Sequence, residues 1–286
     1  MTAREVKPAT KIVSLQGTNS STRPLLHLSG LRSRVLIAPT SPDWHSPKPA
    51  KVVPFYPGAN RMLPFQNRVE AGRLLASQLQ GYAAKAEVIV VALPRGGVPV
   101  AFEIARCLDV PLDILIVRKL GAPWQPELAM GAVASGGIRL LDRALIRSLN
   151  LPNNYVYGLI AREEKEIQRR ETLFRDGCPA QTLSGRTVIL VDDGAATGST
   201  MLAAAEAIRQ QHPKQIVIAV PVASRDAYLT FQARVGKCVC LATPEPFFAV
   251  GQWYESFSQV SDEEVQSLLS RARSRSTEKE FLVQSS

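Results

Sequence analysis

The chain has 286 residues, 45% of them hydrophobic, which is enough to bury one sizeable core. Its net charge of +9 is concentrated in residues 1–61, which carry nine Lys and Arg against two acidic residues. The rest of the chain has a balance of only +2, which argues against a basic groove for nucleic acid. No apolar stretch is long enough to predict a membrane-spanning helix.

The cysteines and histidines form no spacing typical of a metal site or of Ser-His or Cys-His catalysis. These residues are Cys107, Cys178, Cys238 and Cys240, with His27, His45 and His212. We interpret the cysteines as four reduced, mostly buried thiols in a reducing compartment, which predicts a cytoplasmic protein.

Residues 1–61 are rich in Ser, Thr, Pro and basic residues and show no sustained apolar period. We expect this segment to be a disordered extension. Two other interpretations stay open: an organelle transit peptide, which would place the protein in a plastid, or a translation start at Met62.

The following elements alternate between helix and strand. A helix is expected over 65–81, with Val69, Leu74, Leu75 and Leu79 on its apolar stripe. Further helices are expected near 97–108, 153–175, 199–210, 225–234 and 262–272. Strands are expected at 88–93, 112–117, 187–191, 215–222 and 238–242. Residues 119–141 are expected to form a loop and a hairpin around Gly136-Gly137. This order predicts one α/β domain over 62–272, a doubly wound and mainly parallel sheet, followed by a disordered tail over 273–286.

The most informative segment follows the strand expected over 187–191. Two adjacent acids, Asp192 and Asp193, emerge where open α/β sheets place their ligands. Small residues then lead into a helix, whose free amides and positive dipole end suit a phosphate. An ordinary strand–turn–helix corner with exposed aspartates is the alternative. The glycine spacing fits neither a Walker loop nor a dinucleotide fingerprint.

This segment resembles the thirteen-residue signature of type I phosphoribosyltransferases, which bind 5-phosphoribosyl 1-pyrophosphate (PRPP). The resemblance implies that Asp192 and Asp193 bind the ribose hydroxyls and also help to hold Mg²⁺. It implies a small hood and a flexible hairpin loop on the sheet. It also implies a PRPP-binding loop formed by Gly194, Ala195, Ala196, Thr197, Gly198, Ser199 and Thr200.

A second segment, Pro94-Arg95-Gly96-Gly97, looks like the family's pyrophosphate loop, with glycine amides and a guanidinium fork for the anion. The resemblance implies a non-proline cis peptide at Pro94–Arg95. Alone, the segment would equally fit a plain Gly-Gly turn with a surface arginine.

Two more segments are similar to family features. Arg118 and Lys119 lead into a hairpin that is similar to the one that closes over PRPP in the family. The resemblance implies that both side chains contact the pyrophosphate. It also implies that the catalytic residues are Arg95, Lys119, Asp192 and Asp193. The alternative is a basic strand end with a surface hairpin. In residues 243–255, the resemblance implies that Phe248 stacks on the base and that Glu255 helps to hold the metal. Alternatively, the aromatics of this segment seal the end of the sheet.

Two departures separate the chain from the oxopurine enzymes of the family. Ala196 stands where those enzymes place an aspartate, and Arg225 is the nearest cation where they place a lysine. The sequence therefore predicts an Mg²⁺-dependent transferase with PRPP and an unidentified nitrogenous acceptor, a nucleobase or related heterocycle, as its small-molecule partners. A homodimer stays open. The main alternative is a PRPP-sensing regulator on the same fold, while a hydrolase would need a nucleophile that we do not find.

Overall fold

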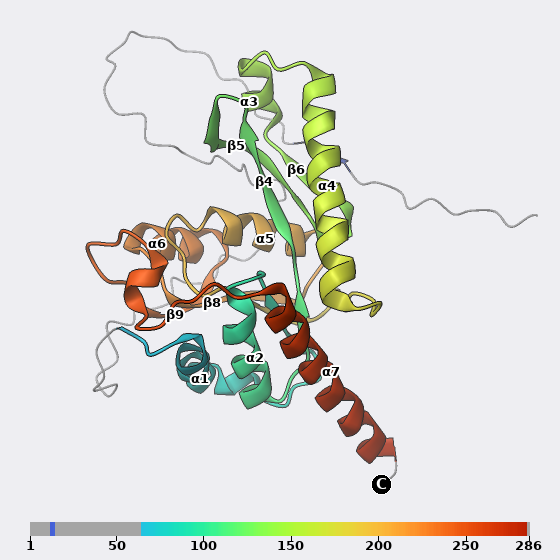
Figure 1. Ribbon diagram of the computed structural model, residues 1–286, viewed down its shortest axis with the longest axis vertical. Helices are drawn as coiled ribbons and strands as arrows, with labels where there is room; N and C mark the ends of the chain where they lie inside the picture. Colours follow the sequence, from blue (N-terminus) through green and yellow to red (C-terminus); the bar gives the residue numbers. More distant parts are fainter. Residues whose placement is uncertain (1–11, 15–63, 285–286) are drawn as a thin grey trace, which may run out of the picture. The chain divides into compact units, whose positions relative to one another are not determined.

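The computed structural model describes residues 12–14 and 64–284 (Figure 1). These residues form two compact units, a smaller unit with residues 117–167 and a larger unit with residues 64–116 and 168–284. The expectation of one domain over 62–272 stays a prediction; within that range, residues 117–141 build a sheet of their own. The disorder expected over 1–61 lies outside the described residues, except for a strand at Ile12–Ser14 that the disorder expectation missed.

The smaller unit is built on an antiparallel sheet. The hairpin expected around Gly136-Gly137 consists of β5 (Gln125–Ala134) and β6 (Ile138–Leu141), and β5 also pairs with β4 (Val117–Ala122). β1 (Ile12–Ser14) pairs with β6 in parallel, and α3 (Arg143–Ser148) follows β6. Gly136 and Gly137 have φ angles of 78° and 72°, as a glycine turn between two strands requires. α4 (Asn153–Arg175) begins in this unit and has the predicted bounds.

The larger unit contains a fully parallel five-stranded sheet, which confirms the predicted fold class. Its strand order is β3 (Leu112–Ile114), β2 (Val88–Ala92), β7 (Thr187–Val191), β8 (Gln215–Val222) and β9 (Lys237–Ala242). Every residue of β2 and β7 is buried, which explains their continuous apolar runs.

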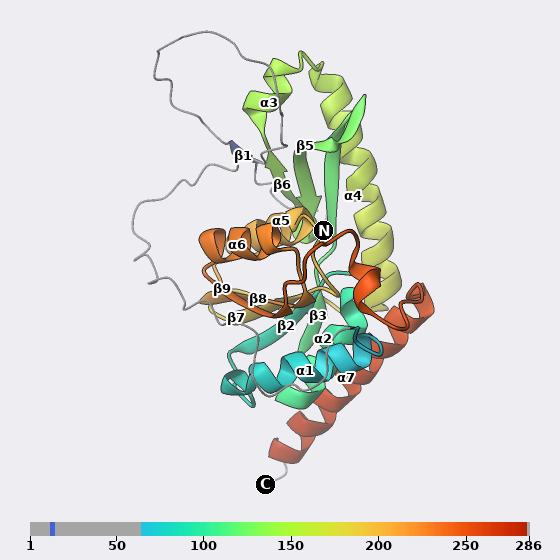
Figure 2. The same cartoon turned by 90° about the vertical axis from the view of Figure 1, so that its left-hand side faces the viewer.

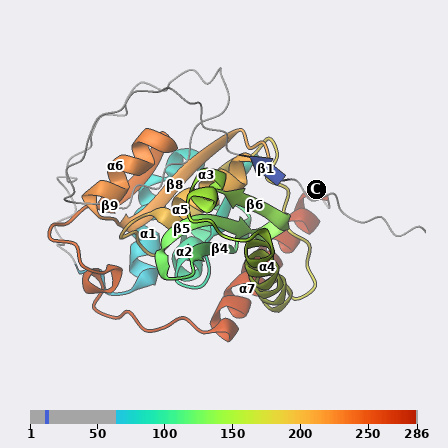
Figure 3. The same ribbon diagram turned by 90° about the horizontal axis from the view of Figure 1, so that it is seen from above.

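Helices cover both faces of this sheet. α1 (Arg68–Gln78), α2 (Gly97–Leu108) and α7 (Asp262–Gln284) lie on one face, and α5 (Ser199–Arg209) and α6 (Arg225–Arg234) lie on the other (Figure 2). Figure 3 shows α6 beside β9, at one edge of the sheet. None of the helices in the described part of the chain combines the length and apolar character needed to span a bilayer.

The apolar stripe predicted for α1 is only half right. Leu75 and Leu79 are fully buried, but the side chains of Val69 and Leu74 are exposed. The buried face is shifted toward small residues because α1 packs closely on α2: a Cβ added to Gly72 would lie 2.6 Å from a backbone carbonyl oxygen of α2. Close helix packing therefore decided which face is buried.

Two predicted element ends were wrong. The strand expected over 112–117 ends at Ile114, and Val117 already belongs to β4 of the smaller unit. The helix expected over 262–272 continues to Gln284, so most of the tail expected to be disordered from residue 273 is helical. The tail from residue 273 is rich in Ser, Arg and Glu and lacks a strong apolar period. The sequence pattern therefore did not predict that the helix continues through it.

Candidate functional site

The acidic pair lies at the carboxyl end of β7, where the sequence placed it. Asp193 follows Asp192 directly, and its backbone N–H donates to Asp192 Oδ1 at 2.9 Å. The loop that follows is fixed to the end of β8: Ala195 donates to the Val222 carbonyl, and Ser224 Oγ donates to the Ala196 carbonyl at 2.6 Å. The loop therefore has a defined path beside two strand ends.

The predicted phosphate cradle ends at the start of α5. Gly198 has a left-handed φ of 72°, and a Cβ there would lie 2.6 Å from the Phe231 ring, so the position requires glycine. Gly198 is the N-cap and supplies no side-chain hydrogen bond to the first turn of α5. The hydroxyls of Thr197 and Ser199 lie 3.0 Å apart beside this turn. The Ser199 N–H donates to Thr197 Oγ1 at 3.4 Å, and a helix start with two hydroxyls beside its first amides suits an anionic phosphate.

The second predicted loop lies against the acidic pair. The Pro94–Arg95 peptide is cis, as the family resemblance implied. A Cβ on Gly96 would lie 2.0 Å from Asp193 Oδ2, and a Cβ on Gly97 would lie 2.9 Å from Asp192 Cα. The two glycines therefore allow the two loops to approach each other, which neither motif alone could show.

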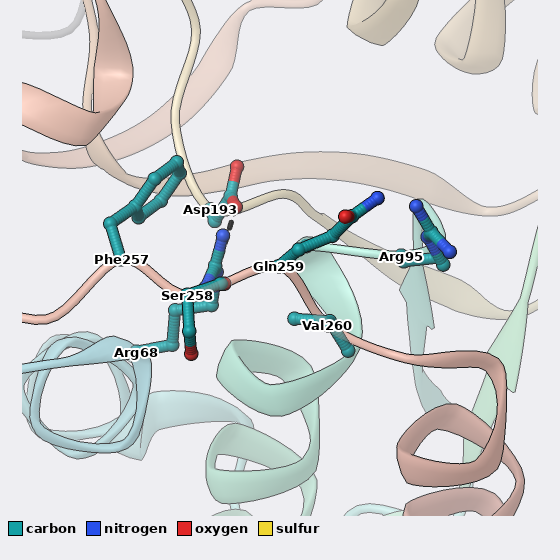
Figure 4. A pocket seen from close by; sticks show the side chains of 8 residues that line it. Arg68, Arg95, Asp193, Phe257, Ser258, Gln259 and Val260 are labelled. Carbon is teal, nitrogen blue, oxygen red and sulfur yellow. Dashed lines mark hydrogen bonds and ion pairs between the residues drawn. The ribbon is translucent and has the colours of Figure 1, made fainter.

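These two loops share a pocket of about 360 Å³ within the larger unit (Figure 4). In Figure 4 the guanidinium of Arg68 meets the carboxylate of Asp193 on one side, and Arg95 lies on the other. Its lining consists of Arg68, Arg95, Gly96, Asp193, Phe257, Ser258, Gln259 and Val260. The structure thus brings residues of both predicted motifs together in one cavity.

The sequence interpretation missed Arg68, which is the main partner of Asp193. Arg68 Nε donates to Asp193 Oδ2 at 2.8 Å, and Nη1 donates to the Ser258 carbonyl at 2.8 Å. The guanidinium also lies 3.9 Å from the centroid of the Phe257 ring, a cation–π distance. The signal that could have identified it is a charged residue on the buried face of a helix. Arg68 is itself buried, and buried charged residues usually have a partner.

The electrostatics of the acidic pair favour hydroxyl donors as ligands. Burial raises the pKa of the Asp192 carboxyl well above its ordinary value of 3.8, and the charge of Asp193 raises it further. Burial also raises the pKa of Asp193, against the opposing effect of Arg68. Tyr254 supports the pair by donating its hydroxyl to the Asp193 carbonyl at 2.6 Å. Two such carboxyls repel a bare anion, whereas the hydroxyls of a sugar diol can donate to them.

The predicted aromatic segment divides into a packed part and an exposed residue. Phe247, Trp253 and Tyr254 pack on a cluster with Phe65 at the sheet end, as the sealing interpretation proposed for them. Phe248 is 75% exposed, so its side chain is accessible to a ligand. Its assignment to the base stays a prediction.

The metal assignment also stays a prediction. Among the described residues, no three His, Cys, Asp or Glu side chains form a group that could hold a metal ion, so Asp192, Asp193 and Glu255 make no such cluster by themselves. Glu255 is exposed, and its backbone N–H donates to the Phe65 carbonyl at 2.7 Å. The donors present therefore fit Mg²⁺ only if substrate oxygens and water complete its coordination, which this ion accepts readily.

Arg118 and Lys119 lie in β4 of the smaller unit. Arg118 Nε pairs with Glu163 at 2.9 Å, and Lys119 Nζ pairs with Glu127 at 3.0 Å. Within this unit both cations are thus balanced by carboxylates. Their role at a pyrophosphate stays a prediction.

The contact between the two loops can be tested with an added methyl group. In Gly97→Ala the new Cβ would meet the Val191 carbonyl oxygen at 2.8 Å and the Asp192 backbone at 2.9 Å, so the acidic pair must shift. For the PRPP-dependent transfer that the family resemblance implies, we expect a loss of about 100-fold in kcat/KM, because a misplacement of about 1 Å can cost that much in rate. Steady-state kinetics would measure it.

Gly81→Ala is the matched control, since a Cβ there has no heavy atom within 4 Å. It should keep the parent kinetics and melting temperature. Equal kinetics for the two variants would contradict the close approach of the loops.

Comparison with known proteins adds family information. The family model described as "Phosphoribosyl transferase domain" matches residues 59–252. The Mycobacterium tuberculosis protein "Putative phosphoribosyl transferase Rv0571c" is 46% identical over 208 residues, covering 73% of this chain and 47% of that protein. The chain thus spans about half the length of this relative, and the same holds for "Putative phosphoribosyl transferase MT0597" from another strain.

A solved structure is similar over a comparable range. The crystal structure of TT1426 from Thermus thermophilus is 42% identical, with a TM-score of 0.65, and the match covers 72% of this chain and 98% of that one.

Proposed function

The chain belongs to the phosphoribosyl transferase domain family, and we propose that it binds PRPP and transfers the phosphoribosyl group to a nitrogenous acceptor, releasing pyrophosphate. One observation carries this proposal. Asp193, from the loop after β7, shares a pocket with Arg95 and Gly96, from the loop after β2. A diol-binding group thus lies beside an anion-binding loop, as a phosphorylated sugar with a pyrophosphate requires.

The parts of PRPP are assigned by the chemistry of each loop. The ribose hydroxyls donate to Asp192 and Asp193. The 5′-phosphate accepts from the amides and hydroxyls at the start of α5, between residues 195 and 200. The pyrophosphate faces Arg95, Gly96 and Gly97, and a role for Arg118 and Lys119 rests on the family resemblance alone.

In the proposed reaction, the bond from C1 of the ribose to the pyrophosphate oxygen breaks, and its electron pair leaves with pyrophosphate. The acceptor nitrogen donates its lone pair to C1 from the opposite face and then loses its proton. The chain contributes orientation through the acidic pair and charge stabilisation through Arg95 and the glycine amides. Mg²⁺, when bound, would neutralise pyrophosphate oxygens, with Asp192, Asp193 and Glu255 as the candidate protein ligands.

The acceptor is a nucleobase or a related heterocycle in this proposal. Phe248 is exposed and offers a ring face for stacking, which contributes about 1–3 kcal/mol per base in other proteins. Ala196 cannot act as a base, and its exposed methyl leaves that role to another group or to solvent. Arg225 begins α6 and is exposed, and it is the cation closest in sequence to the position where the oxopurine enzymes place a lysine.

The test is to incubate the protein with PRPP, Mg²⁺ and a panel of purine, pyrimidine and other heterocyclic bases, and to measure pyrophosphate release. We expect release that depends on one class of acceptor. PRPP binding without release for any acceptor would instead indicate a sensor, and the absence of PRPP binding would overturn the proposal altogether.

A further inference from the structure

A second pocket of the larger unit lies at the opposite edge of the parallel sheet, where the strands begin. It has a volume of about 330 Å³. Four neighbouring strand starts contribute to it: Lys85 and Glu87 precede β2, Thr187 begins β7, Lys214 precedes β8 and Lys237 begins β9. It shares no lining residue with the pocket of Asp193. We call it the lysine pocket.

The charge in the lysine pocket is unbalanced. Three ammonium groups line it, and Glu87 is the one acidic residue among its lining residues. Within the described residues, no ion pair involves Lys85, Lys214 or Lys237. Lys214 and Lys237 lie at the starts of the adjacent strands β8 and β9, about 4.8 Å apart, so an anion placed there would attract both ammonium groups.

Tyr82 adds an independent sign that a polar ligand is accommodated. Its side chain lines the lysine pocket, and its hydroxyl is buried with no hydrogen-bond partner among the described residues. Lys237 Nζ lies 4.9 Å from the centroid of the Tyr82 ring, which places a cation over the same side chain. Buried hydroxyls nearly always have a partner, so this hydroxyl is available to a polar atom of a water molecule or of a ligand.

From these observations we propose that the lysine pocket binds a small anion that carries phosphate groups. Lysine binds phosphate as a point charge, and the hydroxyls of Tyr82 and Thr187 can donate to phosphate oxygens. A hollow of this volume suits a small molecule and not a polymer backbone. The site stands apart from the proposed transferase reaction and does not depend on it.

The experiment is isothermal titration of the full chain with inorganic pyrophosphate in a magnesium-free buffer. Lys214→Gln/Lys237→Gln removes two cations of the lysine pocket. Arg143→Gln/Lys165→Gln is the matched control, because it removes the same charge from exposed positions outside both pockets.

We expect the lysine variant to bind one fewer pyrophosphate per chain than the parent, or to bind it at least about tenfold more weakly, and the control to match the parent. Tyr82→Phe keeps the ring under Lys237 and should weaken the same binding event by a smaller factor. The proposal is overturned if both double variants bind pyrophosphate with the parent stoichiometry and affinity. Unchanged binding in both double variants would mean that pyrophosphate binds only at the Asp193 pocket. That outcome would overturn the lysine-pocket proposal and would not affect the proposed function.

Discussion

Replacing both Asp192 and Asp193 by asparagine should abolish PRPP binding while the protein stays folded. The proposed contacts are hydrogen bonds from the ribose hydroxyls to charged carboxylates, worth about 1.5–3 kcal/mol each. The loss of both hydrogen bonds should raise the dissociation constant for PRPP by about 100-fold or more. Isothermal titration with PRPP and Mg²⁺ would measure it.

The stability of the single Asp192→Asn variant should move in the opposite direction from its PRPP affinity. Burial and the neighbouring Asp193 raise the folded-state pKa of Asp192 above 3.8, so the folded protein binds more protons there than the unfolded chain. The parent therefore loses stability from this group as the pH rises from about 3.8 through the raised pKa. A neutral asparagine removes this loss, and the melting temperature near neutral pH should equal or exceed that of the parent.

Asp176→Asn is the control for the acidic pair. Asp176 is exposed and has a φ of 50°, which asparagine also tolerates, so the variant should keep both PRPP affinity and stability. Unchanged PRPP affinity in the double variant would remove the acidic pair from the site.

Arg68→Ala should cause the largest loss of folding stability among substitutions at this pocket. The Arg68 and Asp193 side chains are only 10% and 14% exposed, so removing the cation leaves a largely buried carboxylate without its partner. Breaking such a pair costs about 3–5 kcal/mol in other proteins. Urea unfolding would measure the free energy, and PRPP titration should show weaker binding because Asp193 loses its orientation.

Arg73→Ala is the matched control on the same helix. Arg73 is 60% exposed and pairs with Glu103, which keeps Arg106 as a second partner, so we expect a loss of at most about 1 kcal/mol. Combining Arg68→Ala with Asp193→Asn should recover part of the stability, because no unpaired charge remains. Strictly additive losses in this double-mutant cycle would contradict the coupling of Arg68 to Asp193.

The sequence alone determined the local features of this protein. Continuous apolar runs predicted β2 and β7, and the long charged stretch of residues 153–175 predicted α4 with its observed bounds. The acidic pair was expected at a strand end and lies there. These predictions succeed because each depends on neighbouring residues, whose pattern reflects whether a segment is covered on one face or on two.

Only the tertiary structure decided which distant residues complete the pocket. Arg68 is separated by 125 residues from Asp193 and by 190 from Ser258, and no local period relates them. The same applies to the exposure of Leu74, which follows from how closely α1 packs on α2, and to the separate unit formed by residues 117–167. Sequence spacing reports the shape of single elements, whereas contacts across more than a hundred residues depend on how those elements pack.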